Sequence, residues 1–237
     1  MNLVKTAVYR HWHKFHGVRR LEVSTLERYL GPASGERILD LGSGKGAFCG
    51  VHNRLGSDAV GVDPAAAEVS IAKRYVDSKG RFVIGSGEDL AFPPERFDKA
   101  VSVCVLEHTR DDARVLREVH RVLKPGGLFA LSVDSLSSRH VSEGFRRHHI
   151  REYHCNQLYG DAKLRRLLSD AGFETLEMEY LFESRLAVSI LRIGSRFHYR
   201  GPFILLFPVL YPFLWLDHVL GGKRKSGMIL VAKARKR

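Results

Sequence analysis

Short, mostly apolar runs alternate with segments of helical periodicity between about residues 37 and 172. Apolar runs of this kind are typical of parallel strands that are buried on both faces of a sheet. We expect strands at 38–41, 59–62, 81–84, 98–103 and 128–133, and helices at 47–55, 65–78, 110–123 and 161–171. This order of elements predicts an α/β fold, with a mostly parallel sheet that carries helices on both faces.

The two ends of the chain depart from this alternation. Residues 1–30 show two helical segments with a break at Gly17. Residues 173–180 and 228–234 alternate apolar and polar positions, which indicates an antiparallel hairpin that closes the sheet. A long insertion separates those two strands. We therefore expect an N-terminal helical lid (1–35), a core (36–181), a basic and hydrophobic insertion (182–226), and a last strand with a basic tail (227–237).

The insertion contains the most apolar stretch of the chain, GPFILLFPVLYPFLWLDHVL at residues 201–220. Residues 203–216 carry no charge, but a membrane-spanning helix needs about 20 apolar residues, and Pro208 and Pro212 are expected to kink it. Helical spacing before this stretch groups Leu186, Ile190, Ile193 and Phe197 on one face, and Arg185, Arg192 and Arg196 on another; the cluster Lys223, Arg224 and Lys225 follows. The insertion predicts a peripheral anchor on an anionic membrane, with an interface between two copies or a cap over a substrate as alternatives.

Composition and charge narrow the possible partners and the cellular location of the protein. The formal net charge is +12, which favours an anionic partner such as a membrane surface, a nucleic acid or a phosphorylated substrate. Three cysteines are an odd number without framework spacing, so we expect reduced thiols. Lys5 and Arg10 interrupt the N-terminal segment, unlike a signal peptide. These features predict a cytoplasmic protein that is bound peripherally to the cytoplasmic face of the membrane.

The strongest chemical signal is the segment DLGSGKG at residues 40–46, where the first strand turns into a helix. Glycines there let a ligand approach the backbone, and the start of the helix offers N–H groups without intrahelical partners. Asp63 ends the second strand, 23 residues after Asp40, where an acid can accept both hydroxyls of a ribose. Together they predict an adenosine-containing cofactor at the carboxyl edge of the sheet.

The spacing D-x-G-x-G-x-G resembles the S-adenosylmethionine loop of class I methyltransferases. Further segments are similar to the same family in the same order: VGVD at 60–63, GSGEDLAF at 85–92, FDKAV at 97–101 with LEH at 106–108, and LREVHRVLKPGG at 116–127. The match covers roughly residues 36–134 and is nearest to the small-molecule branch (type 11, ubiquinone/menaquinone-methyltransferase-like). The resemblance implies a Rossmann-like sheet of seven strands, whose antiparallel C-terminal hairpin would carry the insertion.

The same resemblance implies S-adenosyl-L-methionine as cofactor. Asp40 should organise the loop and the methionine ammonium, and Asp63 should hold the ribose. Ser86 stands where the family often has an acid, so we expect N6 of the adenine to be bound by Ser86, by Glu88 or by water. The expected cofactor contacts are Asp40, Gly42, Ser43, Gly44, Gly46, Asp63, Pro64, Ser86, Gly87, Glu88 and Cys104.

Methyl transfer from a sulfonium mainly needs alignment, and it needs a base only where the acceptor must lose a proton. His108, which follows the fourth strand, is the candidate base, with a structural or packing role as its alternative. The basic segment 146–154 offers His148, His149 and Tyr153 as acceptor contacts, or it is a solvated loop. We expect no metal site, because nothing else supports ligand geometry around these histidines.

These observations predict an S-adenosylmethionine-dependent methyltransferase that acts on oxygen of a small or lipid-linked acceptor at the membrane surface. An anchored enzyme would take a lipidic acceptor, such as a polyprenyl-linked sugar, an isoprenoid quinone precursor or another amphiphile. A soluble acceptor or a nucleic acid, with the insertion as a dimer interface, is one alternative, although VCVL at 103–106 replaces a base-flipping signature. A non-catalytic, cofactor-binding membrane scaffold is another. The loop spacing disfavours a dehydrogenase.

Overall fold

The computed structural model describes residues 17–31, 33–76, 81–197, 202–221 and 224–237. Within them, seven strands form one sheet in the order β3-β2-β1-β4-β5-β7-β6. The strands are β1 (Arg37–Leu41), β2 (Asp58–Asp63), β3 (Phe82–Ile84), β4 (Phe97–Val103), β5 (Leu123–Asp134), β6 (Phe173–Leu181) and β7 (Ile229–Lys236). β7 pairs antiparallel with β5 and with β6, and the other pairs are parallel. The predicted fold class is therefore confirmed.

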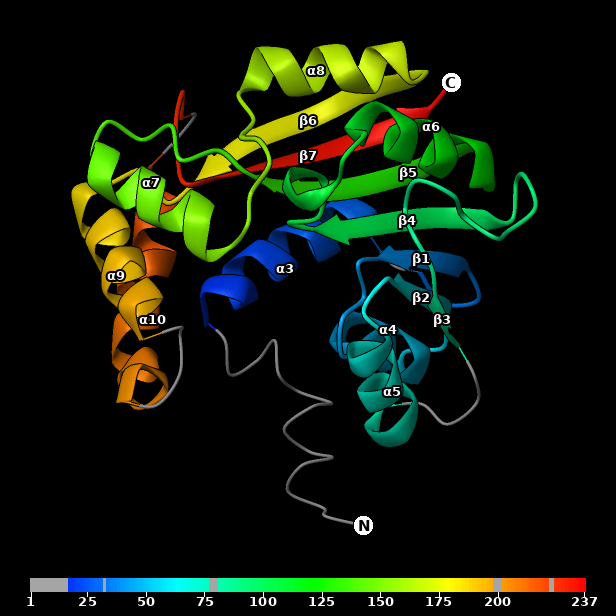
Figure 1. Cartoon of the computed structure of the whole chain (residues 1–237), viewed down its shortest axis with the longest axis horizontal. Helices are drawn as coiled ribbons and strands as arrows, with labels where there is room; N and C mark the ends of the chain where they lie inside the picture. The colour runs from blue at the N-terminus through cyan, green and yellow to red at the C-terminus, as the bar shows by residue number, and fades with distance from the viewer. Residues whose placement is uncertain (1–16, 32, 77–80, 198–201, 222–223) are drawn as a thin grey trace.

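Helices cover both faces of this sheet (Figure 1). They are α3 (Gly17–Leu30), α4 (Ala47–Arg54), α5 (Ala66–Tyr75), the short 3-10 helix η1 (Leu106–His108), α6 (Asp112–Val122), α7 (Glu143–Glu152), α8 (Asp161–Asp170), α9 (Arg185–Arg196) and α10 (Pro202–Leu220). α6 and α8 lie on one side of the sheet, and α3, α4 and α5 lie on the other (Figure 1). The buried apolar side chains accordingly form two clusters, one on each face.

Local sequence explains where these elements begin and what they bury. Ile38 and Leu39 are consecutive in β1 and join different clusters, because successive strand residues point to opposite faces. α6 begins after Asp111, whose carboxylate accepts a hydrogen bond from the N–H of Arg114 at 2.8 Å. Its buried residues Val115 and Val119 are one turn apart and face the sheet.

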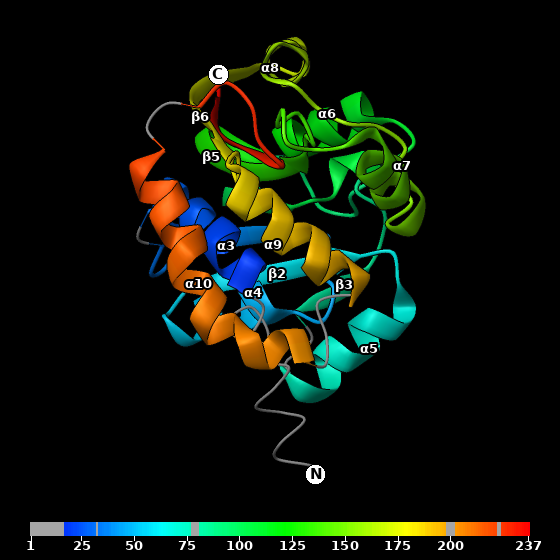
Figure 2. The ribbon, with the colours of Figure 1, turned by 90° about the vertical axis from the view of Figure 1, so that its left-hand side faces the viewer.

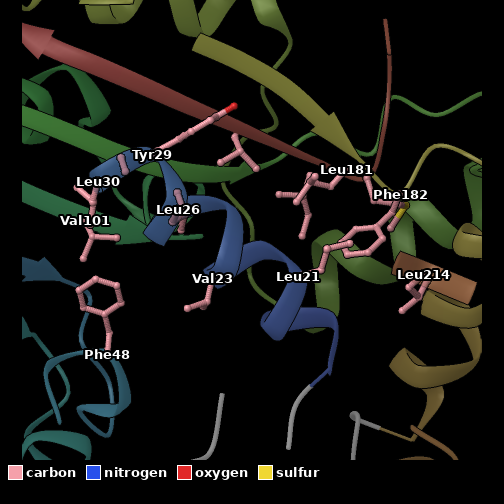
Figure 3. Packing of buried hydrophobic residues seen from close by; sticks show 14 of the residues in the cluster. Leu21, Val23, Leu26, Tyr29, Leu30, Phe48, Val101, Leu181, Phe182 and Leu214 are labelled. Atoms are coloured by element: carbon pink, nitrogen blue, oxygen red, sulfur yellow. The ribbon is translucent and has the colours of Figure 1, made fainter. Parts of the chain in front are cut away.

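α3 forms a packed layer on the sheet. It begins at Gly17, where the sequence predicted a break, and residues 1–16 of the predicted lid lie outside the described residues. Leu26 is fully buried, and α3 contacts β4, β5 and β7. Figure 3 shows its apolar side chains between Phe48 and Val101 on one side and Leu181 and Phe182 on the other. The proposed division of the chain into a lid, a core and an insertion stays a prediction.

Two helices, α9 and α10, form in the described residues of the insertion. α9 matches the predicted amphipathic helix, and Ser184 caps it by accepting from the N–H of Ala187 at 3.1 Å. α10 passes through Pro208 and Pro212 as a single helix that bends along its course (Figure 2). α10 packs against α3 and α9. In the part of the chain that the structure describes, the length and apolar character of the helices fall short of what a membrane crossing needs.

Candidate functional site

The glycine-rich loop joins β1 to α4 at the carboxyl edge of the sheet. The N–H groups of Gly42 and Ser43 both donate to the carbonyl of Val62, at 2.8 and 3.0 Å, and so tie the loop to β2. The N–H of Gly44 donates to Oδ2 of Asp63 at 2.8 Å. The two segments that the sequence selected for cofactor binding are therefore in direct contact.

Two glycines show why the loop excludes side chains. Gly42 has φ +71°, and a Cβ atom built on it would lie 2.3 Å from Cγ2 of Val105, beyond the end of β4. Gly44 has φ +49°, a conformation that side chains disfavour, but a Cβ atom there would meet nothing within 4 Å. The backbone at Gly44 thus borders open space, while Gly42 lets the exit of β4 approach the loop.

Two acids are held rigidly beside this loop. Asp40 is buried and accepts from the Cys49 thiol at 3.3 Å. Burial raises the pKa of Asp40 to about 7, against the smaller lowering by the Cys49 hydrogen bond. Asp63 is half-buried, and its second oxygen, Oδ1, accepts from the N–H of Ala65 at 2.8 Å. Each oxygen of Asp63 receives one backbone hydrogen bond, which fixes its direction and leaves further lone pairs for a ligand hydroxyl.

The segment after β3 differs in part from its expected role. Ser86 is exposed, and its hydroxyl accepts from the N–H of Glu88 at 3.1 Å. Glu88 is committed elsewhere, because its Oε1 accepts from the N–H groups of Arg110 and Asp111, at 2.9 and 3.2 Å, just before α6. Of the two side chains expected near the adenine, Ser86 is therefore the more available. Pro64 is exposed, and Gly87 lies close to Leu41.

Cys104 directly follows β4 and has φ +51°, a left-handed conformation that is uncommon outside glycine. Its thiol donates to Oε1 of Glu22 at 3.0 Å, and the hydroxyl of Ser132 in β5 donates to the same oxygen at 2.5 Å. Glu22 belongs to α3, is fully buried, and pairs with Arg19 at 3.1 Å. α3 thus brings a buried carboxylate to the ends of β4 and β5. The predicted cofactor contacts lie at the carboxyl ends of the adjacent strands β3, β2, β1 and β4.

A second set of buried polar side chains, around Glu107, lies beside the set around Glu22. Glu107 in η1 is fully buried, and its Oε1 accepts from the N–H of Asp134 at 3.1 Å. Oδ2 of Asp134 lies 2.7 Å from Nε2 of His149, and the thiol of Cys155 donates to the same oxygen at 3.5 Å. Burial and then the charge of Asp134 raise the pKa of Glu107 to about 8. The hydrogen bond from His149 holds the pKa of Asp134 down, although burial acts in the opposite direction.

The predicted catalytic and substrate residues do not all lie together. His108 is exposed, with Nδ1 3.5 Å from the carbonyl of His154. The basic segment 146–154, expected to be either a set of acceptor contacts or a solvated loop, lies largely in helix α7, which Ser142 caps by accepting from the N–H of Phe145 at 3.2 Å. This helix buries His149 against Asp134 and leaves His148 half-buried. The side chain of Tyr153 is half-buried, with its hydroxyl 3.5 Å from that of Ser195 in α9.

Asp134, His149 and Cys155 offer metal-ligating atoms within 4.8 Å of one another. Two nitrogen or oxygen ligands about 2.0 Å from a tetrahedral zinc ion lie roughly 3.3 Å apart. The Asp134–His149 distance of 2.7 Å is instead that of a hydrogen bond. As placed, these groups are hydrogen-bonded to one another, and the expectation of no metal stays a prediction.

The sequence reading missed Glu22, Ser132, Glu107 and Asp134. Two local signals existed: Asp134 is a charged residue at the end of an apolar strand, and Glu107 adjoins the selected His108. Glu22 and Ser132 are 110 residues apart, and no local pattern links them.

Comparison with known proteins agrees with this geometry. Residues 39–131 match the family model described as "Methyltransferase domain". A ubiquinone biosynthesis O-methyltransferase of Azorhizobium caulinodans is 38% identical over 108 residues, which cover 44% of this chain and 43% of that protein. The chain therefore matches less than half of that relative's length.

Two solved structures share the fold. One is an S-adenosylmethionine dependent methyltransferase from Mesorhizobium loti, with TM-score 0.65, 21% identity, and coverage of 90% of this chain and 96% of that one. The other is a geranyl diphosphate C-methyltransferase from Streptomyces coelicolor, with TM-score 0.68, 19% identity, and coverage of 92% and 79%. At these identities the structures bear on the fold alone.

Proposed function

Residues 39–131 are a methyltransferase domain, and from this premise we propose that the protein transfers a methyl group from S-adenosylmethionine to an oxygen atom of a phenolic, quinone-type acceptor. The observation that carries the proposal is Asp63, held by the N–H groups of Gly44 and Ala65 beside the open face of the glycine-rich loop. The choice of acceptor rests on the ubiquinone biosynthesis O-methyltransferase relatives.

The residues present fit this cofactor. Asp63 would accept the ribose hydroxyls, the loop at Gly44 would border the ligand, and Ser86 remains available near the adenine. Asp40 is buried behind the loop, where its carboxylate would face the methionine end. When bound, S-adenosylmethionine supplies an activated methyl group on a sulfonium. The protein's own task is then to align an acceptor oxygen and to receive its proton.

The reaction is tested with purified protein, radiolabelled S-adenosylmethionine and phenols that carry a second ring hydroxyl, with and without a short prenyl chain. We expect a labelled methyl ether, and we expect the prenylated phenol to be the better acceptor. Protein that binds the cofactor in calorimetry but labels none of these phenols would overturn the proposed acceptor class.

We also propose that α9 and α10 hold the enzyme on an anionic membrane surface. Thirteen large apolar side chains are exposed in the described residues, and ten of them lie between residues 186 and 220. The ten are Leu186, Ile193, Phe197, Leu206, Val209, Phe213, Trp215, Leu216, Val219 and Leu220. So many exposed apolar side chains on two neighbouring helices favour an interaction surface.

Charge on the same helices favours a membrane over a second copy of the chain. Arg185, Arg192 and Arg196 are exposed on α9, each one position before an exposed apolar residue and so about 100° around the helix. A basic residue near an anionic leaflet contributes on the order of 1 kcal/mol. The predicted basic cluster after α10 contributes less than expected, because Arg224 turns inward to pair with Asp217 at 3.1 Å, and residue 223 lies outside the described residues.

Flotation with vesicles tests this surface. We expect the protein to float with phosphatidylglycerol vesicles at low salt, less so at high salt, and weakly with phosphatidylcholine vesicles. A protein that floats with neither and sediments as a dimer would instead assign the apolar surface to an interface between two copies.

A further inference from the structure

Glu107 lies next to the cofactor loop, yet no predicted role uses it. It follows Val105 by two residues, and Val105 is the side chain that approaches Gly42 of the loop. Its backbone is fixed, because its carbonyl accepts from the N–H of Asn156 at 2.7 Å. The backbone of Glu107 is therefore held in η1, two residues after the side chain that meets the loop expected to hold the methyl donor.

One oxygen of this carboxyl group is held and the other is unused. Oε1 accepts from the N–H of Asp134 at 3.1 Å. Oε2 is buried and has no hydrogen-bond partner among the described residues. A buried oxygen without a partner is costly, so it calls for an explanation such as a catalytic role or a bound water or ion. A hydroxyl group of an acceptor would supply the missing hydrogen bond.

The neighbouring carboxylates Glu22 and Asp134 are hydrogen-bonded to other side chains, which leaves Glu107 as the carboxyl group that is available to react. Glu22 is satisfied by Arg19, Cys104 and Ser132, and Asp134 is satisfied by His149 and Cys155. Tyr159 donates to Asp112 at 2.9 Å. Among the described residues, the groups with a charge interaction with Glu107 are Arg19, Cys104, Asp134, Cys155 and Tyr159.

An acceptor could reach Glu107 past Arg19. The Arg19 side chain is 42% exposed, whereas its partner Glu22 is completely buried. The positive charge of Arg19 also lowers the pKa of Asp134 and of Glu107, so this partly exposed side chain lies close enough to act on both buried carboxyls. Arg19 therefore marks the side from which we expect an acceptor to approach.

We propose that Glu107, rather than His108, is the base that takes the proton from the acceptor hydroxyl; this inference rests on the proposed function. The acceptor O–H bond breaks and its proton passes to Oε2 of Glu107. The oxygen forms the new O–CH₃ bond as the methyl–sulfur bond breaks, and the electron pair of that bond stays on sulfur. The charge balances, because a sulfonium and a carboxylate become a neutral thioether and a neutral carboxylic acid.

The environment of Glu107 suits this role. A base works best when its pKa is near the working pH, and burial with the charge of Asp134 brings the pKa of Glu107 to about 8. His108 is exposed and lies 3.5 Å from a backbone carbonyl, away from this buried group. The two neighbouring residues therefore form a matched pair for a test.

The test compares Glu107→Gln with His108→Gln, using catechol and nitrocatechol as acceptors. Loss of a general base typically costs about 100-fold or more in rate, so we expect this loss for Glu107→Gln with catechol, at unchanged cofactor affinity. Nitrocatechol is already ionised near neutral pH and should restore most of the rate. His108→Gln should stay within a few-fold of the wild type.

A readout without any acceptor accompanies the kinetics. The infrared spectrum of the wild type should contain protonated-carboxyl bands from Asp40 and Glu107, which disappear as the pH rises through about 7 and about 8, and Glu107→Gln should lack only the second band. If the wild type has no such band, or if Glu107→Gln methylates catechol at the wild-type rate, the inference is overturned. If the wild type binds the cofactor but methylates neither catechol, the proposed function fails, and the inference fails with it.

Discussion

The cofactor half of the sheet and the C-terminal insertion differ in which side chains they present and in how those side chains are held. At the ends of β1, β2 and β4, short polar side chains are fixed by backbone hydrogen bonds, as Asp63 is by Gly44 and Ala65. On α9 and α10, large apolar side chains such as Val209 and Leu220 are exposed instead, at 63% and 74%. The family match at residues 39–131 covers the first region and ends before the second. The first region carries the family match, and the second carries the proposed membrane surface.

The largest expected effect lies in the cofactor half. Asp63→Ala removes the acceptor for two ribose hydroxyls, and hydrogen bonds to a charged group are worth about 1.5–3 kcal/mol each, so affinity for S-adenosylmethionine should fall about 100-fold or more. Calorimetry measures the change. Asp58→Ala, at the opposite end of β2, is the matched control and should bind normally. Equal affinity in Asp63→Ala and the wild type would contradict the ribose assignment.

Substitutions in the insertion should weaken membrane binding and leave cofactor affinity unchanged. Phe213 and Trp215 are about half exposed on α10. Burial of the exposed half of each side chain in a membrane interface is worth about 1 kcal/mol, so replacing both by Ser should weaken vesicle binding about 30-fold. Cofactor affinity should not change. Leu55→Ser, at an exposed leucine after α4, is the control that should leave flotation intact. Loss of cofactor binding in the double variant would break the separation of the two regions.

The sequence predicted the cofactor half in detail. The glycine-rich loop, β2 and Asp63 are consecutive local features, so spacing alone placed them together. The insertion was predicted less well. α9 followed from its periodicity, but Ile190 is buried although the apolar positions near it in the helical pattern are exposed. Which side of an amphipathic helix meets the core depends on its neighbours, which the periodicity does not contain.

The buried acids of the cofactor half should make stability depend on pH. Burial raises the pKa of Asp40 to about 7 and that of Glu107 to about 8. The folded protein therefore holds these protons more tightly than the unfolded chain, whose carboxyls ionise at their ordinary, lower pKa values. Stability is fully present at low pH and is lost as the pH rises toward 7–8.

Between pH 7 and pH 8 we expect the free energy of unfolding to fall by about 1 kcal/mol, since each proton held only by the folded state contributes at most about 1.4 kcal/mol per pH unit. Urea unfolding at the two pH values measures this change. Asp40→Asn and Glu107→Gln should each flatten the dependence. His52, whose pKa burial lowers to about 4, acts mainly below pH 6.5 and does not enter this window. Rising stability across the window would contradict these burial effects.

The smallest expected effect concerns the contact between α3 and α10, where the two regions meet. The guanidinium of Arg20 in α3 lies 4.9 Å from the ring centroid of Tyr211 in α10. Such a cation–π contact at an exposed site is worth about 0.5–1 kcal/mol, so Arg20→Ala should lower the free energy of unfolding by that amount. Arg117→Ala, at an exposed position on α6, should leave stability unchanged within the error of denaturant titration. Equal stabilities of the two variants would show that α10 is held without this contact.

The parts of the site that the sequence did not reveal depend on long-range contacts. Glu22 reaches Cys104 across 82 residues, and Glu88 is taken up by the N–H groups of Arg110 and Asp111 through the packing of α6. A charged residue in an amphipathic helix normally faces solvent, so Glu22 gave no sign of its burial. Glu107 was passed over for its neighbour His108, because a histidine titrates near neutral pH and a glutamate does so only when buried.

The central claim is transfer of a methyl group to oxygen, and the site of the transferred carbon tests it most directly. We would incubate the protein with S-adenosylmethionine carrying a ¹³C-labelled methyl group and a prenylated catechol in phosphatidylglycerol vesicles, and record the carbon spectrum of the extracted product. The account predicts one signal in the methoxy region, which disappears in Asp63→Ala. A signal from methyl bound to carbon, or no transferred label while the cofactor is bound, would contradict it.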